Sequence, residues 1–296
     1  MPVALRVLRV AAAAVLAVAA LVVPVSPAHQ SVKIAQAAGN ANWTEYHYDD
    51  AHTGNAPGLP QVNTVSAGWV SGSMDDEVYA EPLIFNGAVY SVTLNNTVYA
   101  FNESTGATLW SKHVGTPETT GWGCGNINPT GMLGTPIIDA ASSVMYVVAE
   151  ISLNTPTTVD AVYKLFALDL TNSGNVLWST NLAPGGFDWR IEQERGALAL
   201  DNGYVLVPMG GRAGDCGNYH GYVMAVQISS HAVTGVYVTQ GQGMGIWAGG
   251  GVVVDDATGN MFVTTGNGTG TGCDTTDGTQ TGPPKYENDS VARLSI

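Results

Sequence analysis

The sequence contains few charged residues, and few of those are basic. Only 11% of its 296 residues are charged, and 24 acids outnumber 10 lysines and arginines, which gives a net charge of −14. Because so acidic a surface repels phosphate backbones, we expect no nucleic-acid partner. The helix formers Glu and Lys are scarce, whereas Gly, Thr, Val and Asn are abundant, which indicates short strands joined by tight turns.

Several catalytic motifs are absent. The sequence has no G-x-S-x-G elbow, no H-E-x-x-H pair and no C-x-x-C-H haem site. Gly241–Gly245 is rich in glycine but lacks the strand–helix context of a phosphate loop. Asp274 and Asp277 lie in an oxygen-rich stretch similar to a Ca²⁺ loop, although the downstream Glu of an EF-hand is missing. We retain these two acids as candidate metal ligands.

The sequence also lacks an apolar run of membrane-spanning length. The run from Val10 to Val25 is shorter than the roughly 20 residues that a bilayer requires. It follows Arg6 and Arg9 and precedes small residues, which is the order of a secretory signal. We therefore predict a signal peptide at residues 1–37, export to the cell envelope or medium, and no stable membrane anchor after cleavage. An uncleaved anchor is the alternative.

Internal repeats are the strongest positive feature of the sequence. Val98–Asn102, Leu165–Asp169 and Tyr222–Gln227 resemble one another, and each follows two further apolar strands. In the third unit we align Thr234-Gly235 with the turn that follows in the first two. The equivalent repeat residues are Ala100, Gly106 and Trp110, then Ala167, Gly174 and Trp178, then Ala225, and finally Ala292.

Each unit therefore reads as four short antiparallel strands that are apolar on both faces. Radial stacking buries both faces of such sheets, so we predict an all-β fold, a β-propeller, over residues 65–296, after an entry segment at 38–64. The propeller would have three complete units and partial first and last ones, because the fourth lacks its last strand and Val65–Gly72 reads as a last strand alone. Either the chain is part of a ring of seven or eight blades, which we favour, or Val65–Gly72 closes a four-bladed ring.

The pattern Val-Tyr, then Tyr-Ala-x-Asn/Asp, Thr/Ser-Gly and Leu-Trp resembles the pyrroloquinoline-quinone (PQQ) repeat. This repeat occurs in quinoprotein alcohol dehydrogenases, in an outer-membrane assembly lipoprotein and in secreted bacterial proteins of unknown activity. Cys124–Pro129 and Gly214–Gly221 are similar to segments of those secreted proteins. Resemblance to the dehydrogenases implies PQQ at the ring centre with Ca²⁺ beside it. The chain departs from them because it has no adjacent cysteine pair, and its acids match no family ligand residue by residue.

Loops on one face of a propeller join second to third strands and each blade to the next. In this sequence these connections are mostly long: residues 115–133, 150–161, 183–195, 209–221, 240–249 and 266–289. Long loops commonly carry function, so we predict that this long-loop face binds a ligand. The candidate ligand-binding residues are aromatic or polar: Trp122, Asp188, Trp189, Arg190, Glu192, Asp215, His220 and Trp247.

These candidates also have structural interpretations. The tryptophans would pack between blades, Asp188–Glu194 would form a local ion network, and His220 would bond to loop backbone. The three cysteines all fall on the long-loop face. One disulfide between loops is the simplest arrangement in an oxidising compartment, and we favour Cys124 with Cys216, with Cys273 as the alternative partner.

Three functions fit these observations. The leading hypothesis is a module that binds a small polar ligand or a protein partner through the long-loop face. The alternative is a PQQ- and Ca²⁺-dependent alcohol or sugar oxidoreductase, and the third is a scaffold for envelope assembly.

Overall fold

The computed structural model describes residues 42–58, 64–269 and 288–296. The predicted signal peptide at residues 1–37 and parts of the entry segment lie outside these ranges. Their regular secondary structure is almost entirely β, with one short 3-10 helix at Leu170–Asn172. Within them, no helix has the length and apolar character needed to cross a bilayer.

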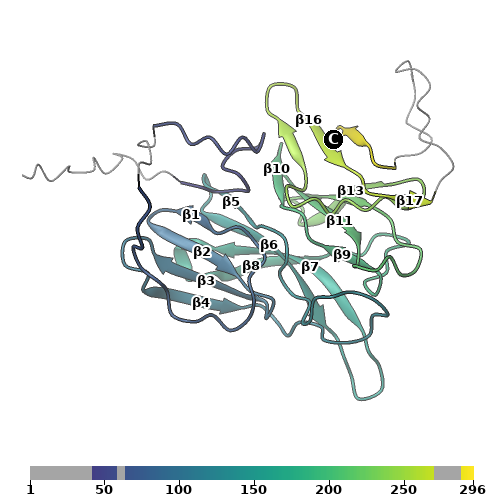
Figure 1. Cartoon of the computed structure of the whole chain (residues 1–296), viewed down its shortest axis with the longest axis horizontal. Helices are drawn as coiled ribbons and strands as arrows, with labels where there is room; N and C mark the ends of the chain where they lie inside the picture. The colour runs from purple at the N-terminus through teal and green to yellow at the C-terminus, as the bar shows by residue number, and fades with distance from the viewer. Residues whose placement is uncertain (1–41, 59–63, 270–287) are drawn as a thin grey trace, which may run out of the picture. The chain divides into compact units, whose positions relative to one another are not determined.

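The strands form successive antiparallel sheets, which are the blades of a propeller (Figure 1). Blades 1 and 2 have four strands each: β1 (Leu83–Phe85), β2 (Ala88–Val92), β3 (Thr97–Asn102) and β4 (Thr108–His113), then β5 (Ile137–Asp139), β6 (Val144–Ser152), β7 (Ala161–Asp169) and β8 (Asn175–Asn181). Blade 3 contains β9 (Glu192–Glu194), β10 (Ala199–Asp201), β11 (Tyr204–Gly211), β12 (Tyr222–Gln227) and β13 (Ala232–Val238). Blade 4 contains β15 (Val253–Asp255), β16 (Asn260–Thr264) and β18 (Val291–Leu294), while β14 (Gln242–Gly243) pairs with β17 (Gly268–Thr269) between two loops.

The four repeat alanines occupy equivalent positions, which confirms the repeat and the all-β propeller fold. Each lies in the third strand of its blade, opposite a residue of the second strand, and each is buried: Ala100 opposite Tyr90, Ala167 opposite Tyr146, Ala225 opposite Leu206, and Ala292 opposite Val263. A small side chain at this position allows neighbouring sheets to approach each other closely.

Each interior sheet contributes to two hydrophobic cores. In β6, Met145 and Val147 pack with blade 1, whereas Tyr146 and Val148 pack with blade 3. A third core joins blades 3 and 4 through residues such as Leu206 and Met261. Alternate residues of one strand therefore face different neighbours, which explains the nearly continuous apolar runs in the sequence.

In blades 1 and 2, a tryptophan of the fourth strand docks on a turn of the next blade. Trp110 of β4 lies against Gly174, which has a φ of 69° in the β7–β8 turn. Trp178 of β8 stacks on His231 in the equivalent turn of blade 3, with ring centroids 4.5 Å apart. The repeated Gly and Trp therefore form one contact between blades, which neither blade could make alone.

The predicted alignment of Thr234-Gly235 with the turn is wrong. His231 occupies the turn position, with a φ of 56°, and its backbone N–H donates to the carbonyl of Gln227. Gly235 pairs with Ala225, at the position that Trp110 and Trp178 take in blades 1 and 2. Blade 3 lacks a docking indole, and the cavity between blades 3 and 4 is about 570 Å³, larger than the cavity of about 290 Å³ beside Trp110 between blades 1 and 2.

The segment Val65–Gly72 is not a strand, contrary to the sequence prediction. It makes no ladder in the described structure, because no neighbouring strand offers backbone partners there. Trp69 nevertheless docks on Gly106 of blade 1, and its indole N–H donates to the carbonyl of Glu103 at 2.8 Å. Among the described residues β18 pairs with β16 alone, so the ladder that would close a four-bladed ring is absent.

The entry segment crosses the first strands of three blades. Trp43 forms a β-bridge with Ile84 of β1, the carbonyl of Thr44 accepts from Ile138 of β5, and the carbonyl of Asp50 accepts from Val254 of β15. β10 in turn lies beside β5 and β15. The first strands are therefore the inner strands of the propeller, and the entry segment ties them together.

We expect the substitution Gly174→Ala to lower the free energy of unfolding more than Gly203→Ala does. Both glycines have positive φ, so each alanine costs about 1 kcal/mol in backbone strain. Only at Gly174 would the new methyl group meet the indole of Trp110, about 2.8 Å away, and this overpacking should add roughly 1–3 kcal/mol. Denaturant unfolding of both variants measures the difference, and equal losses would contradict docking as a stabilising contact.

Candidate functional site

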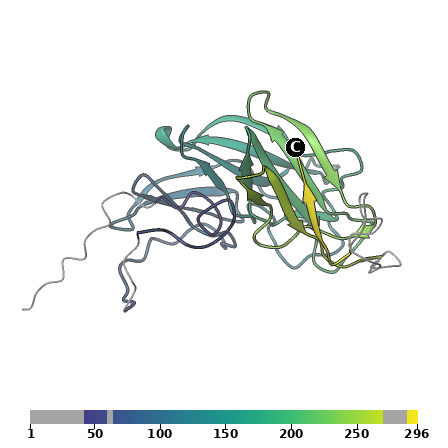
Figure 2. The same cartoon turned by 90° about the horizontal axis from the view of Figure 1, so that it is seen from above.

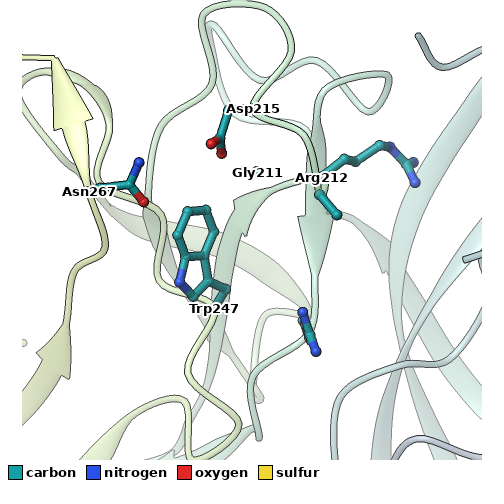
Figure 3. A pocket seen from close by; sticks show the side chains of 7 residues that line it. Gly211, Arg212, Asp215, Trp247 and Asn267 are labelled. Carbon is teal, nitrogen blue, oxygen red and sulfur yellow. The ribbon is translucent and has the colours of Figure 1, made fainter. Parts of the chain in front are cut away.

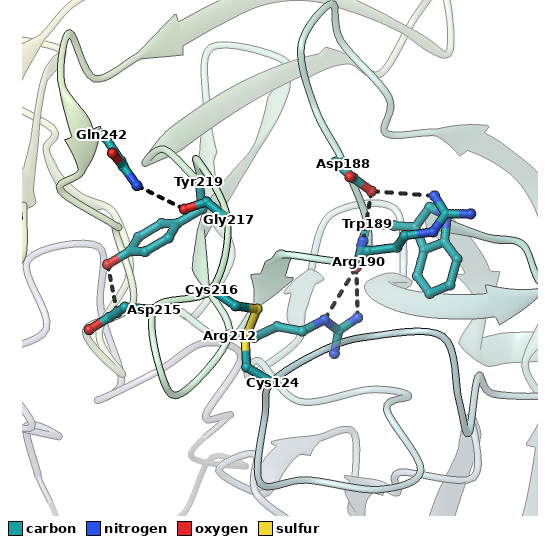
Figure 4. Close-up of a disulfide and its surroundings, with 10 residues drawn as sticks. All are labelled: Cys124, Asp188, Trp189, Arg190, Arg212, Asp215, Cys216, Gly217, Tyr219 and Gln242. Atoms are coloured by element: carbon teal, nitrogen blue, oxygen red, sulfur yellow. Dashed lines mark hydrogen bonds and ion pairs between the residues drawn. A yellow bond between two sulfur atoms is a disulfide. The ribbon is translucent and has the colours of Figure 1, made fainter.

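A disulfide and a buried ion pair hold the long loops together. Cys124 and Cys216 form a disulfide that joins the loop before blade 2 to the loop inside blade 3 (Figure 4). This is the pair that the sequence favoured over one with Cys273, which lies outside the described residues. Beside the disulfide, the N–H of Gly125 donates to the carbonyl of Ala213. The loops of the long-loop face therefore form one connected surface.

Arg212 is the centre of the buried network beneath this surface. Its guanidinium donates to both oxygens of Glu150 at 2.8 and 2.9 Å, and both side chains are fully buried. The hydroxyl of Tyr163 donates to the same carboxylate. The guanidinium contacts three further loop residues: the hydroxyl of Thr130, the carbonyl of Trp189 and the ring of Trp122. The side chain of Arg212 therefore has a structural role, in which it holds these loop residues together.

The inner strand of blade 3 is interrupted beside the ring centre. β9 pairs with Met209–Gly211 and β10 pairs with Tyr204–Leu206, so the ladder is broken opposite Val207 and Pro208. Pro208 has no N–H to donate, which favours a break at this point. Between β9 and β10, the backbone N–H of Ala197 instead donates to the carbonyl of Gly249, and the backbone N–H of Leu198 donates to the carbonyl of Thr135. Arg195 is the first residue after β9 and lies at the start of this break.

Two cavities meet at Arg195 and Trp247. The outer cavity, about 240 Å³ in volume, opens among the long loops and is also lined by Asp215 and Asn267 (Figure 3). The second, about 350 Å³, lies on the side of the entry segment, and its polar and aromatic lining includes Tyr46, Tyr79 and Glu81. Figure 3 shows the side chain of Arg212 pointing away from the outer cavity, which leaves Arg195 as its basic group.

Close packing fixes the indole of Trp247. A Cβ at Gly245 or at Gly266 would lie within 3 Å of the ring, so both positions require glycine. The ring of Tyr219 lies on another side, with centroids 5.8 Å apart, and the Tyr219 hydroxyl donates to Asp215. Trp247 is therefore a rigid, half-buried aromatic surface beside the cation of Arg195.

Arg195 lines both cavities. Its side chain is exposed, and within the described ranges it forms no ion pair. Asp215 lines the outer cavity and accepts the hydrogen bond of Tyr219. A guanidinium presents several N–H donors in one plane, which suits a carboxylate or another planar anion.

Two buried acids lie behind the cavity wall. Burial raises the pKa of Glu194 to about 8, because its carboxyl group is enclosed and accepts a single backbone N–H, from Gly134. Burial likewise raises the pKa of Glu192 to about 7, and the backbone N–H of Asp188 bonds to that carboxyl group. These acids support the loop backbone rather than facing the cavities.

The structure separates the eight predicted ligand-binding residues into two groups. Asp215 and Trp247 line the outer cavity. The other six make structural or surface contacts: Trp122 under Arg212, Trp189 bonded to Asp160, Arg190 stacked on Trp189 and paired with Asp188, Glu192 buried, and His220 bonded to the carbonyl of Thr239. Asp274 and Asp277, the candidate metal ligands, lie outside the described residues.

Arg195 was not among the eight candidates. In the sequence it ends a run of charged residues, Asp188 to Arg195, and no pattern distinguishes it from its neighbours. Its position at the interrupted strand depends on Pro208, thirteen residues away in the chain and opposite it in the sheet. The available signal was the rarity of basic residues in so acidic a chain.

The resemblance to quinoprotein dehydrogenases implies a Ca²⁺ site beside PQQ. No group of three His, Cys, Asp or Glu side chains within the described residues is arranged to hold a metal ion. Asp215 and Glu81 line the cavities, whereas Glu192 and Glu194 are buried against backbone donors.

Comparison with known proteins identifies relatives of the fold. A family model described as outer membrane protein assembly factor BamB matches residues 64–212. The chain is also similar in structure to a quinohemoprotein alcohol dehydrogenase from Comamonas testosteroni, with a TM-score of 0.60 and 20% identity over 79% of this chain and 36% of that one. A search of curated protein sequences gave no match.

Two further solved structures show the same relation. One is a quinohemoprotein alcohol dehydrogenase from Pseudomonas putida HK5, with a TM-score of 0.58 and 19% identity over 77% of this chain and 35% of that one. The other is a europium-containing methanol dehydrogenase, with a TM-score of 0.56 and 17% identity over 76% and 42%. The chain spans well under half the length of these enzymes, and identities this low show a shared fold alone.

We expect Arg212→Met to destabilise the protein by about 3–5 kcal/mol, because Glu150 would remain buried without its partner. Arg190→Met is the matched control, since the Arg190–Asp188 pair is exposed and should contribute less than about 1 kcal/mol. The double variant Arg212→Met/Glu150→Leu should recover part of the loss. Denaturant unfolding tests all three, and similar losses for the two single variants would count against the network.

Stability should fall as the pH rises from about 5 to 8. Native Glu194 keeps a proton up to a pKa of about 8, whereas the unfolded chain releases it near 4.5, so the native state binds more protons in this range. Glu194→Gln should make the decline shallower, while Glu103→Gln, at an exposed position, should leave it unchanged. Unfolding midpoints measured at several pH values decide this, and identical slopes for both variants would refute it.

Proposed function

The chain belongs to the PQQ-repeat β-propeller family, and from that premise we propose that it binds a small, hydroxylated carboxylate on its long-loop face. The ligand would occupy the cavities on either side of Arg195 and Trp247. The observation that carries this proposal is the exposed guanidinium of Arg195, which has no ion-pair partner among the described residues. The chain has 10 lysines and arginines against 24 acids, and one of these few basic side chains lines both cavities.

Each side chain around the cavities has a chemical role in this proposal. Arg195 would bind the carboxylate through paired N–H donors, which gives both charge and orientation. The fixed ring of Trp247 would pack against the apolar face of the ligand. Asp215 and Asn267 in the outer cavity, and Glu81 in the second, are suited to hydroxyl groups. Sugar acids combine these features.

A protein-binding role is a second candidate, because the description of the matching family names an assembly factor. The loops that the disulfide and Arg212 hold together would form a preorganised surface for such a partner. In both cases we propose that the chain is exported after cleavage of residues 1–37, which fits the presence of a disulfide.

The experiment is a titration that follows tryptophan fluorescence, with D-glucuronate and D-glucose as probes. We expect glucuronate to bind and Arg195→Ala to weaken it at least tenfold, because a hydrogen-bonded charge contributes about 1.5–3 kcal/mol. Arg195→Lys should keep part of the affinity, since it keeps the charge but loses the paired donors.

Arg190→Ala is the matched control, because Arg190 is a solvent-exposed arginine of the same face that lines neither cavity. It should bind glucuronate as the unaltered protein does. If glucose and glucuronate bind equally, or if Arg195→Ala binds glucuronate normally, the carboxylate proposal fails.

A further inference from the structure

The second cavity has an aromatic lining that comes from three separate parts of the chain. Tyr46 belongs to the entry segment, Tyr79 to the residues before β1, and Trp247 to the loop before blade 4. The entry segment, purple in Figure 2, crosses the first strands of the blades and so brings Tyr46 to the cavity. Because the face of an aromatic ring is negatively polarised, three such rings around one space attract a cation.

Neighbouring residues hold two of these rings in place. His47 stacks on the ring of Tyr46, with centroids 4.2 Å apart. A Cβ on Gly249 would lie 3.8 Å from the Tyr46 hydroxyl, so this side chain reaches across to the loop before blade 4, and the indole of Trp247 is confined by its own close contacts. Tyr79 is 47% exposed, which leaves its ring accessible to a ligand. The aromatic lining is thus largely preorganised, which lowers the cost of binding.

The same cavity carries one negative and one positive side chain. Glu81 and Arg195 both line it, yet they form no ion pair with each other. One carboxylate oxygen of Glu81 accepts the backbone N–H of His47 at 3.3 Å, and the backbone N–H of Glu81 donates to the hydroxyl of Thr135. A simple anion would be repelled by Glu81 and a simple cation by Arg195, whereas a zwitterion matches both charges.

We propose that the hydroxylated carboxylate assigned to this face also carries a trimethylammonium group, which occupies the second cavity. This assignment rests on the proposed function, because the carboxylate of the ligand would bind Arg195. The trimethylammonium group would lie among the three rings, with Glu81 as its counter-ion. The hydroxyl group would face the outer cavity, where Asp215 and Asn267 offer hydrogen-bonding groups.

The lining favours a trimethylammonium group over a primary ammonium. A primary ammonium donates three hydrogen bonds and needs acceptors for them, whereas a trimethylammonium group donates none and is attracted by ring faces. The hydroxyl of Thr135, a neighbouring acceptor, is bonded to the N–H of Glu81. The excess of acids over basic residues, 24 against 10, also draws cationic groups toward the chain.

The first test is isothermal titration calorimetry of the full chain with two probes of the same shape. Carnitine is a hydroxylated carboxylate with a trimethylammonium group, and 3-hydroxy-5,5-dimethylhexanoate replaces its charged nitrogen by carbon. We expect carnitine to bind about tenfold more tightly than this neutral isostere, because only the cation is attracted by the rings and by Glu81. Equal affinities for the two probes would overturn the proposal.

The second test uses variants of the lining. Glu81→Gln keeps an acceptor for the N–H of His47 but removes the charge, so it should weaken carnitine about tenfold and leave the isostere unchanged. Tyr79→Leu keeps an apolar side chain but removes an exposed ring, and it should weaken carnitine about threefold. Glu103→Gln is the matched control, because Glu103 is an exposed acid that lines neither cavity, and it should bind both probes normally. Equal losses for carnitine and the isostere in Glu81→Gln would contradict the role of Glu81 as a counter-ion.

The outcomes separate failure of this proposal from failure of the proposed function. If glucuronate binds through Arg195 but carnitine binds no better than its isostere, the carboxylate site stands and the trimethylammonium assignment is wrong. If Arg195→Ala binds glucuronate and carnitine as the unaltered protein does, the proposed function fails and this assignment fails with it.

Discussion

The fold depends on contact between sheets that cannot bury both of their faces alone. Met145 and Tyr146 are adjacent in β6, yet one packs with blade 1 and the other with blade 3. The Trp110–Gly174 and Trp178–His231 contacts add a specific element to this general packing. Where the indole is missing, at Gly235, the cavity between the blades is larger than the one beside Trp110.

The candidate ligand site lies where this packing of sheets is locally interrupted. The inner strand of blade 3 is interrupted opposite Pro208, where it forms no ladder hydrogen bonds with β11. Arg195 lies at this interruption and lines two cavities. A break in a sheet is tolerated there because neighbouring blades supply the lost hydrogen bonds, through Thr135 and Gly249. The buried Arg212–Glu150 pair then keeps the surrounding loops in place.

The sequence was sufficient for the blade architecture because that architecture repeats. Ala100, Ala167, Ala225 and Ala292 recur with their neighbours, so one pattern could be checked against another. The turn of blade 3 was misplaced because His231, rather than a glycine, adopts the left-handed conformation there. Arg195 could not be singled out, since its exposure depends on a strand break and on side chains from other blades.

The disulfide has a topological effect on the chain. Cys124 precedes blade 2 and Cys216 lies within blade 3, so the whole of blade 2 belongs to a closed covalent circle. The hairpin tip between β6 and β7, residues 153–160, is exposed and is the natural place for a protease to cut. A single cut there would open the circle without releasing a fragment, and the nicked molecule would stay in one piece until the sulfur bond was reduced.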